Sequence, residues 1–308
     1  MAITEPTMRS DFAGYLTPAM SAPIFEEAAR ASVAMQLAQQ IPLGAEGQTI
    51  PVVTGRVRAG WVDEAAAKPT TRAALGLKTI TPKKLAAIAV VSSEVVRANP
   101  GNYMQLMRNQ VAEAFAEAFD LAAFADLGPD GTAGGGPFAT YLDQSPHTVE
   151  IGSTTGANGG IHGDLVAGLT VLVNAGKTLT GWGFDARVEP LLWGAVDGNG
   201  RPIYVDLPTD DASSALARPG RLLNRPSFIG DLLAGTGGDT WGYGGDWRQA
   251  VWGVVGGITY DVSTEASVTI GGELRSLWER NLVAIRAEAE YGWLVNDPAA
   301  FVRYVNAI

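Results

Sequence analysis

Besides a helical spacing over residues 24–38 near the N-terminus, two stretches of the chain carry apolar side chains three and four positions apart, which is the spacing of a helix that buries one face. Residues 102–128 form the clearer stretch, and a Gly-Pro pair ends it, so we predict a long helix there. Its length suits a structural spine. A second helix is predicted over residues 164–176, with Asp164 as its cap and Gly176 as its end.

Other stretches alternate apolar and polar side chains, as half-buried strands do. Residues 257–263 and 283–291 show this alternation, and residues 47–55 and 85–96 are predicted to be two further strands that pair. Pro51 lacks the amide hydrogen that a central strand needs, so the strand at 47–55 should lie at a sheet edge. Helices and strands together predict an α+β fold.

The two strands that should pair are separated by about thirty residues of weakly apolar sequence. Within them, residues 60–72 read GWVDEAAAKPTTR, and Trp61 is the one large aromatic residue. Residues 56–84 include seven basic and two acidic side chains, a net charge of +5, which leaves −15 for the rest of the chain. One interpretation is a solvated loop, and the other is an arm that docks on the acidic surface of an identical neighbour.

The composition excludes several classes of protein. The 308 residues suggest one large domain or two intimate ones, and the absence of cysteine excludes disulfides, cysteine-ligated metals and thiol catalysis. A net charge of −10 argues against a protein that grips nucleic acid along its surface. The sequence shows neither an apolar run of membrane-spanning length nor a signal-peptide pattern, so we expect a cytosolic setting and no membrane partner.

No group of residues forms a recognisable catalytic set. Residues 174–178, NAGKT, resemble part of a phosphate-binding loop, but Val171 stands where that loop needs its first glycine. His147 and His162 are expected to be exposed loop residues rather than catalytic or metal-binding ones. We therefore predict no catalytic residue, no cofactor and no metal site.

Acidic residues recur along one side of the predicted long helix. Glu113, Glu117 and Asp120 are spaced so that they share a face. They could bind a cation, but a face that is solvated or contacts a partner is the favoured interpretation. Four tryptophans could likewise form a sugar platform, although packing is favoured for them: Trp61, Trp241, Trp247 and Trp252.

A series of motifs follows the polar N-terminal stretch in a fixed order. These are GWVDEAAAKP, KKLAAIAVVSSEVV, VAEAFAEAFDLAAFADLGPDGT, VDGNGRPIY, LLNRPSFIGD, GGDWRQAVWGVVGGITYDVS and NLVAIRAEAEYGWLVNDPAAFVRYV. Their order resembles the major capsid proteins of tailed double-stranded DNA bacteriophages, which have the Hong Kong 97-like fold. One motif departs from the family pattern, because Asn224 and Arg225 replace its usual glycine region.

The resemblance implies a domain organisation for this chain. It implies an N-terminal arm with a short helix over residues 1–45 and an extended β-hairpin loop over 46–90. A peripheral domain with the spine helix would comprise residues 91–128 and 266–308. An axial domain would occupy residues 129–265.

The resemblance also implies a function, which is assembly and not catalysis. The chain would form pentamers and hexamers that close into an icosahedral phage head around double-stranded DNA, without sequence-specific binding. It would reside in the virion after assembly in the cytoplasm of a bacterial host. Its partners would be copies of itself, a separate scaffolding protein, a portal and decoration proteins.

The extended loop would lie across a neighbouring subunit, with Trp61 as a buried anchor. The residues proposed to make this contact are Trp61, Glu64, Lys68, Arg72, Lys83 and Lys84. No asparagine partner can be matched to a loop lysine, so a covalent crosslink is not predicted. A cellular nanocompartment shell of the encapsulin type is the alternative with the same fold, and a hydrolase or sugar-binding enzyme is the alternative from another class.

Overall fold

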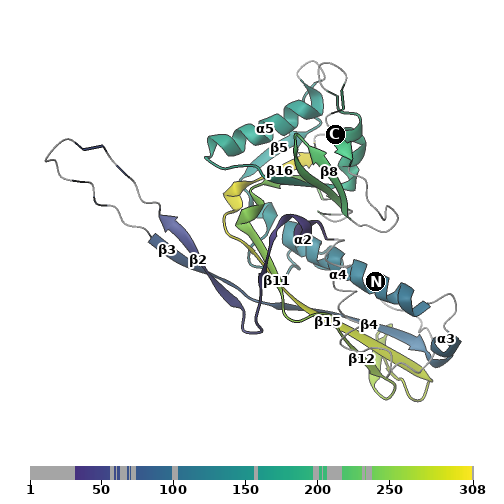
Figure 1. The fold of residues 1–308 in the computed structure, drawn as a ribbon. Coiled ribbons are helices and arrows are strands. Elements are labelled where there is room, and N and C mark those ends of the chain that lie inside the picture. Colours follow the sequence, from purple (N-terminus) through teal and green to yellow (C-terminus); the bar gives the residue numbers. More distant parts are fainter. Residues whose placement is uncertain are drawn as a thin grey trace.

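The computed structural model describes residues 32–55, 74–98, 103–155, 159–196, 204–206, 217–230 and 238–306, together with the single positions 59, 61, 62, 68, 70, 201, 202 and 233. Figure 1 shows a body of two parts, each built around a sheet, and a hairpin that projects from the body. The long helix α4 (Tyr103–Ala125) lies along the lower part. Residues 1–31 of the predicted arm lie outside the described residues.

One long strand, β15 (Leu282–Val295), organises the five-stranded sheet of the lower part. It pairs antiparallel with β4, β11 and β12, and β1 adds parallel to β11. These strands are β1 (Gln39–Pro42), β4 (Lys83–Ser92), β11 (Ala250–Val254) and β12 (Thr259–Ser263). The predicted alternation over residues 283–291 is confirmed from Arg286 onward, where buried positions alternate with exposed or half-buried ones.

Helix α4 packs on this sheet through an aromatic cluster. Phe119 is 2% exposed and lies at the centre of that cluster. Its ring neighbours are Phe138, Trp252, Tyr291 and Trp293, with ring centroids 5.5 to 6.3 Å away. Edge-on and tilted contacts of this kind add to the apolar burial, so this cluster anchors α4 on the sheet. The short helix α2 (Val33–Leu37) packs between α4 and the sheet of the upper part, and α3 (Ser93–Ala98) follows β4 and packs on it.

The upper part contains a seven-stranded sheet in the order β5-β16-β10-β6-β9-β8-β7. Its strands are β5 (His147–Ile151), β6 (Gly181–Asp185), β7 (Tyr204–Asp206), β8 (Ala217–Leu222), β9 (Arg225–Gly230), β10 (Thr240–Gly245) and β16 (Phe301–Asn306). Helix α5 (Gly160–Asn174) packs on β5 and β16, and α6 (Glu189–Trp193) is shorter. Gly168 permits the close approach of α5, because a Cβ there would lie 2.2 Å from the Tyr304 hydroxyl.

Two hairpins stand apart from these sheets within the described residues. The long one pairs β2 (Gln48–Gly55) with β3 (Ala74–Ile80), and the short one pairs β13 (Ser267–Ile270) with β14 (Glu273–Ser276). Short 3-10 turns complete the described structure at Leu142–Gln144, Ala186–Val188, Trp247–Gln249 and Pro298–Ala300. Since β2 has one partner only among the described strands, its predicted place at a sheet edge is confirmed.

The predicted pairing of residues 47–55 with 85–96 is wrong. Strand β2 pairs with β3, in a register that places Pro51 opposite Leu77, while β4 pairs with β15. Strand β4 also ends at Ser92, and residues 93–98 turn into α3 with Glu94 in its first turn. The physical reason is local, because an acidic side chain in the first turn favours a helix start over a continued strand.

The helix predicted over 164–176 begins earlier than expected. Gly159, with φ of 101°, precedes its first turn at Gly160, so Asp164 is not its cap. Asp164 is instead buried and accepts a hydrogen bond from the Gly152 amide at 2.8 Å. The predicted end is confirmed, since Gly176 follows the helix with φ of 69°.

The sheets cut across the predicted domain ranges. Strands β11 and β12 fall within residues 129–265, yet they pair in the sheet of the lower part because β15 offers a long edge to both. Strand β16 falls within residues 266–308, yet it pairs with β5 and β10 in the upper sheet. The two sheets therefore do not follow the predicted ranges at these three strands, and the division into a peripheral and an axial domain stays a prediction.

Candidate assembly interface

The projecting hairpin carries apolar side chains that its own chain does not cover. Side chains alternate across a strand, so Leu75 and Leu77 of β3 lie on one face of the hairpin. They are 70% and 75% exposed. Opposite Leu77 in register is Pro51, and Thr49 and Thr79 continue the same face with their hydroxyl oxygens 3.3 Å apart. An apolar face on a two-stranded ribbon has no layer beneath it within the described chain, which is typical of a surface that another molecule covers.

Trp61 is fully exposed, with a relative accessibility of 105%, and Val62 beside it is 41% exposed. A tryptophan that remains fully exposed in its own chain gains no stability from folding. Lys68, also predicted as a contact residue, is exposed. Glu64 and Arg72 lie outside the described residues.

The base of the hairpin is tied to the body. Lys78 of β3 donates a hydrogen bond to the Asn296 carbonyl. Lys84 Nζ lies 2.8 Å from Glu288 Oε2. Lys83 precedes it in β4 and has no ionic or hydrogen-bonded partner among the described residues. The two adjacent lysines therefore differ, because Lys84 is engaged within the chain and Lys83 is available.

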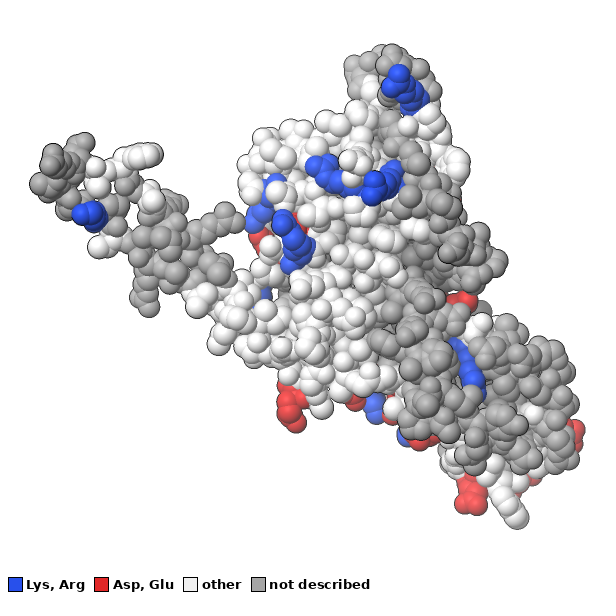
Figure 2. Space-filling view, viewed as in Figure 1, with Lys and Arg blue, Asp and Glu red and all other residues white. Residues whose placement is uncertain are grey.

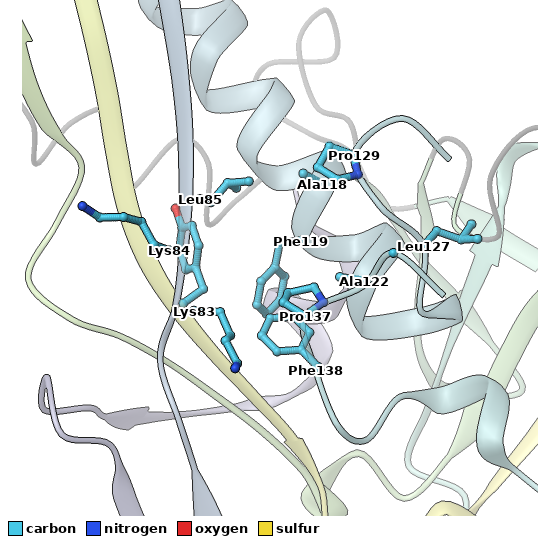
Figure 3. A pocket seen from close by; sticks show the side chains of 12 residues that line it. Lys83, Lys84, Leu85, Ala118, Phe119, Ala122, Leu127, Pro129, Pro137 and Phe138 are labelled. Atoms are coloured by element: carbon cyan, nitrogen blue, oxygen red, sulfur yellow. The ribbon is translucent and has the colours of Figure 1, made fainter. Parts of the chain in front are cut away.

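A cavity of about 190 Å³ opens beside this base, between β4, α4, β15 and the turn that follows α4. Figure 3 shows how its lining converges from these elements. The buried floor is largely apolar and includes Ala118, Phe119, Ala122, Phe138 and Tyr291. The remaining lining residues are Lys83, Lys84, Leu85, Leu127, Pro129, Gly135 and Pro137.

The three acidic residues predicted to share a helix face lie on one side of α4, but they differ in burial. Glu117 is exposed and Glu113 is half-buried, whereas Asp120 is only 4% exposed, which corrects the prediction for Asp120. Asp120 accepts hydrogen bonds from the Ser32 hydroxyl at 2.6 Å and from the amides of Val33 at 2.8 Å and Ala34 at 3.1 Å. It therefore holds the start of α2 against α4.

Burial raises the pKa of Asp120 to about 7, because desolvation of the carboxylate outweighs the three hydrogen bonds that favour the charged form. Sequence reasoning missed this contact, although Ser32 directly before an apolar block is an ordinary helix-start signal. Among the described residues, no group of His, Asp or Glu side chains is arranged to hold a metal ion.

Two further predictions are corrected by the position of the histidines. His147 is half-buried at the start of β5, with its Nε2 atom buried, and His162 lies in α5, so neither is an exposed loop residue. The tryptophans were expected to pack rather than form a platform, and for two of them this is confirmed. Trp247 and Trp252 are each 3% exposed in the core, far in character from the exposed Trp61.

Charged side chains are unevenly spread over the face drawn in Figure 2. Lys and Arg gather over the upper part, whereas Asp and Glu line the lower edge. No described helix is both long enough and apolar enough to cross a membrane. A projecting ribbon with an uncovered apolar face, mounted on a body whose described residues form large buried clusters, is typical of a subunit that assembles with others.

The comparisons with known proteins identify the kind of assembly. The pattern of the phage capsid family matches residues 13–306. A protein of Mycobacterium phage D29 named "Probable major capsid protein gp17" is 42% identical over all of this chain and 94% of its own length. Its namesake in Mycobacterium phage L5 is also 42% identical, over 96% of this chain and 91% of its own length.

The solved structures agree on the fold. A chain from Gordonia phage Cozz matches with a TM-score of 0.70 at 25% identity, over 90% of this chain and 87% of that one. A capsid chain of an empty GTA particle matches with a TM-score of 0.60 at 17% identity, over 99% of this chain and 94% of that one. The chain belongs to the phage capsid family and is a phage major capsid protein. This family is one of structural proteins and not of enzymes.

Proposed function

We propose that the chain assembles as pentamers and hexamers that close into an icosahedral head shell around double-stranded DNA. The observation that carries the proposal is the projecting β2–β3 hairpin, whose Leu75 and Leu77 remain 70% and 75% exposed. Burying one such leucine side chain fully against a neighbouring subunit contributes about 1.5–3 kcal/mol to the free energy of association. Repeated in every subunit, this contribution favours a closed lattice over free subunits.

The hairpin is proposed to be the extended loop that lies across a neighbouring subunit, with Trp61 as its anchor. The lower sheet with α4 is proposed to be the peripheral domain, and the upper sheet with α5 the axial domain. The acidic chain supports enclosure of DNA without specific binding, because a net charge of −10 does not attract the phosphate backbone. A separate scaffolding protein, a portal and decoration proteins are proposed partners on the family resemblance, as is assembly in the bacterial cytoplasm.

The purified chain should be tested by sedimentation velocity and negative-stain electron microscopy, alone and with the candidate scaffolding protein. We expect rings with five and six subunits, or closed shells of uniform diameter. Closed shells too small to need hexamers would favour the nanocompartment alternative. A chain that stays monomeric under both conditions, at concentrations where related capsid proteins assemble, would reject the proposal.

A further inference from the structure

The cavity beside the hairpin base has features that its own chain leaves unused. Tyr291 lines it and is 2% exposed, and its hydroxyl has no hydrogen-bond partner among the described residues. Burial raises the pKa of Tyr291, so the phenol stays neutral and can both accept and donate a hydrogen bond. Because the hydroxyl oxygen itself is inaccessible, Tyr291 does not offer it to a molecule in the cavity, which leaves the space largely apolar.

A lysine without a partner in the described part of the chain lies on the same side of the sheet as that hydroxyl. Lys83 and Tyr291 are direct cross-strand partners, so their side chains project from the same face of the sheet. Lys84 projects from the opposite face toward Glu288, and Figure 3 shows it pointing away from the cavity. The cavity thus combines an apolar floor with the lysine Lys83 at its edge.

Trp61 has the properties that match this combination. Its side chain joins a large apolar ring to a single N–H donor, and it is the fully exposed tryptophan of the chain's described residues, at 105%. In the sequence, Asp63 and Glu64 follow it by two and three positions, so a carboxylate accompanies the ring wherever it docks. Because the ring is exposed in its own subunit, it can enter this cavity only in another copy.

We propose that Trp61 of one subunit inserts into the cavity of a neighbouring copy, between Phe119, Phe138 and Tyr291. The indole ring packs on the apolar floor of the cavity, and the charge of Lys83 favours a loop whose sequence carries Asp63 and Glu64 next to Trp61. The inference rests on the proposed assembly function and adds the receiving site to it. Trp278 is a natural competitor, since it is 76% exposed and is followed by Glu279.

The absence of cysteine makes site-directed crosslinking a clean test. Mosaic shells would be formed from excess wild-type chains with a small share of two variants, Trp61→Cys and Pro137→Cys, and treated with a short bismaleimide. Pro137 is exposed at the cavity mouth, so the pair should give a covalent dimer on a denaturing gel. The matched control replaces Trp61→Cys by Trp278→Cys and should give no dimer. The excess of wild-type chains keeps assembly independent of the variants.

A dimer from the Trp278 pair in place of the Trp61 pair would overturn the proposal, and so would intact shells that give no dimer from either pair. Both results would leave the assembly function standing. Wild-type chains that form no shells would instead reject the assembly function itself. The two failures are therefore distinguishable in one experiment.

A double-mutant cycle gives an independent measurement. Ala122→Phe places a ring inside the cavity, and Trp61→Ala removes the proposed occupant. If both changes remove the same contact, the double variant should raise the concentration needed for assembly no more than either single variant does. Trp278→Ala combined with Ala122→Phe should be additive. Additive effects for the Trp61 pair would contradict the proposal.

Discussion

The aromatic core under α4 and the β2–β3 hairpin both carry large apolar side chains, but only the core buries them within the subunit. In the core, Phe119 is 2% exposed and contacts four other rings. In the hairpin, Leu75 and Leu77 alternate correctly for a half-buried strand, yet remain 70% and 75% exposed. The comparison teaches that the body is stabilised within the subunit, whereas the described residues leave the hairpin face uncovered, as the proposed contact with a neighbour requires.

Phe119→Ala should have the largest effect on the isolated subunit. The change removes the centre of the aromatic cluster and leaves a cavity, which typically costs about 3–5 kcal/mol. Urea unfolding of the unassembled subunit, followed by tryptophan fluorescence, measures the loss. A loss below about 1 kcal/mol would show that α4 is not anchored by this ring.

Asp120→Asn should remove a pH dependence from the body. The pKa of Asp120 is about 7 in the folded subunit, against an ordinary value of 3.8 for an aspartate in an unfolded chain, so the folded state binds the proton more tightly. Wild-type stability should therefore fall as the pH rises from about 4 through about 7, by up to about 1.4 kcal/mol per pH unit. Unfolding midpoints at several pH values, for wild type and variant, measure the difference in slope.

Glu117→Gln is the matched control for that slope, because Glu117 is exposed on the same helix. Its profile should follow the wild type. Parallel profiles for wild type and Asp120→Asn would mean that Asp120 does not titrate in this range.

The long helix and the alternating strands could be predicted because their periods hold over many consecutive residues. The spine helix was predicted over 102–128 and is observed as Tyr103–Ala125. The contact between Ser32 and Asp120 could not be predicted from the sequence, since the two residues are 88 positions apart. Strand β16 shows the same limit, because only the tertiary fold decides that it leaves the sheet of β15 and joins β5 and β10.

For the candidate interface, too, some features could be predicted from the sequence and others could not. The exposure of Trp61 in its own subunit was predictable, because a single large aromatic in a weakly apolar excursion has no core of its own. The cavity was not, because its lining comes from β4, α4, β15 and the turn after α4. A missing hydrogen-bond partner for Tyr291 has no signature in sequence.

The hairpin should respond in the opposite sense from the core. Changing Leu75→Ser and Leu77→Ser together should alter the stability of the unassembled subunit by less than about 0.5 kcal/mol, because both side chains are exposed. The protein concentration needed for assembly should rise at least about tenfold. The reason is that each contact between subunits loses more than about 1.4 kcal/mol of association free energy when the leucines are no longer buried there. Light scattering against concentration measures this threshold.

The control is Thr49→Ser with Thr79→Ser, which takes only two methyl groups from the same face of the hairpin. Its threshold should stay close to that of the wild type. Unchanged assembly by the leucine variant would place the hairpin face outside the lattice contacts.

The smallest effects should come from changes to the two lysines at the hairpin base, Lys83 and Lys84. These changes test where the body of the subunit ends and the surface for a neighbour begins. Lys84 is paired with Glu288 within the subunit, so Lys84→Glu should lower subunit stability by up to about 1 kcal/mol, with the loss reduced in high salt. Lys83 has no such partner among the described residues, so Lys83→Glu should leave the unassembled subunit unchanged and raise the assembly threshold at low salt only, because salt screens an exposed charge contact. Equal behaviour of the two variants in both measurements would remove the distinction between the lysine that belongs to the body and the one available to a neighbour.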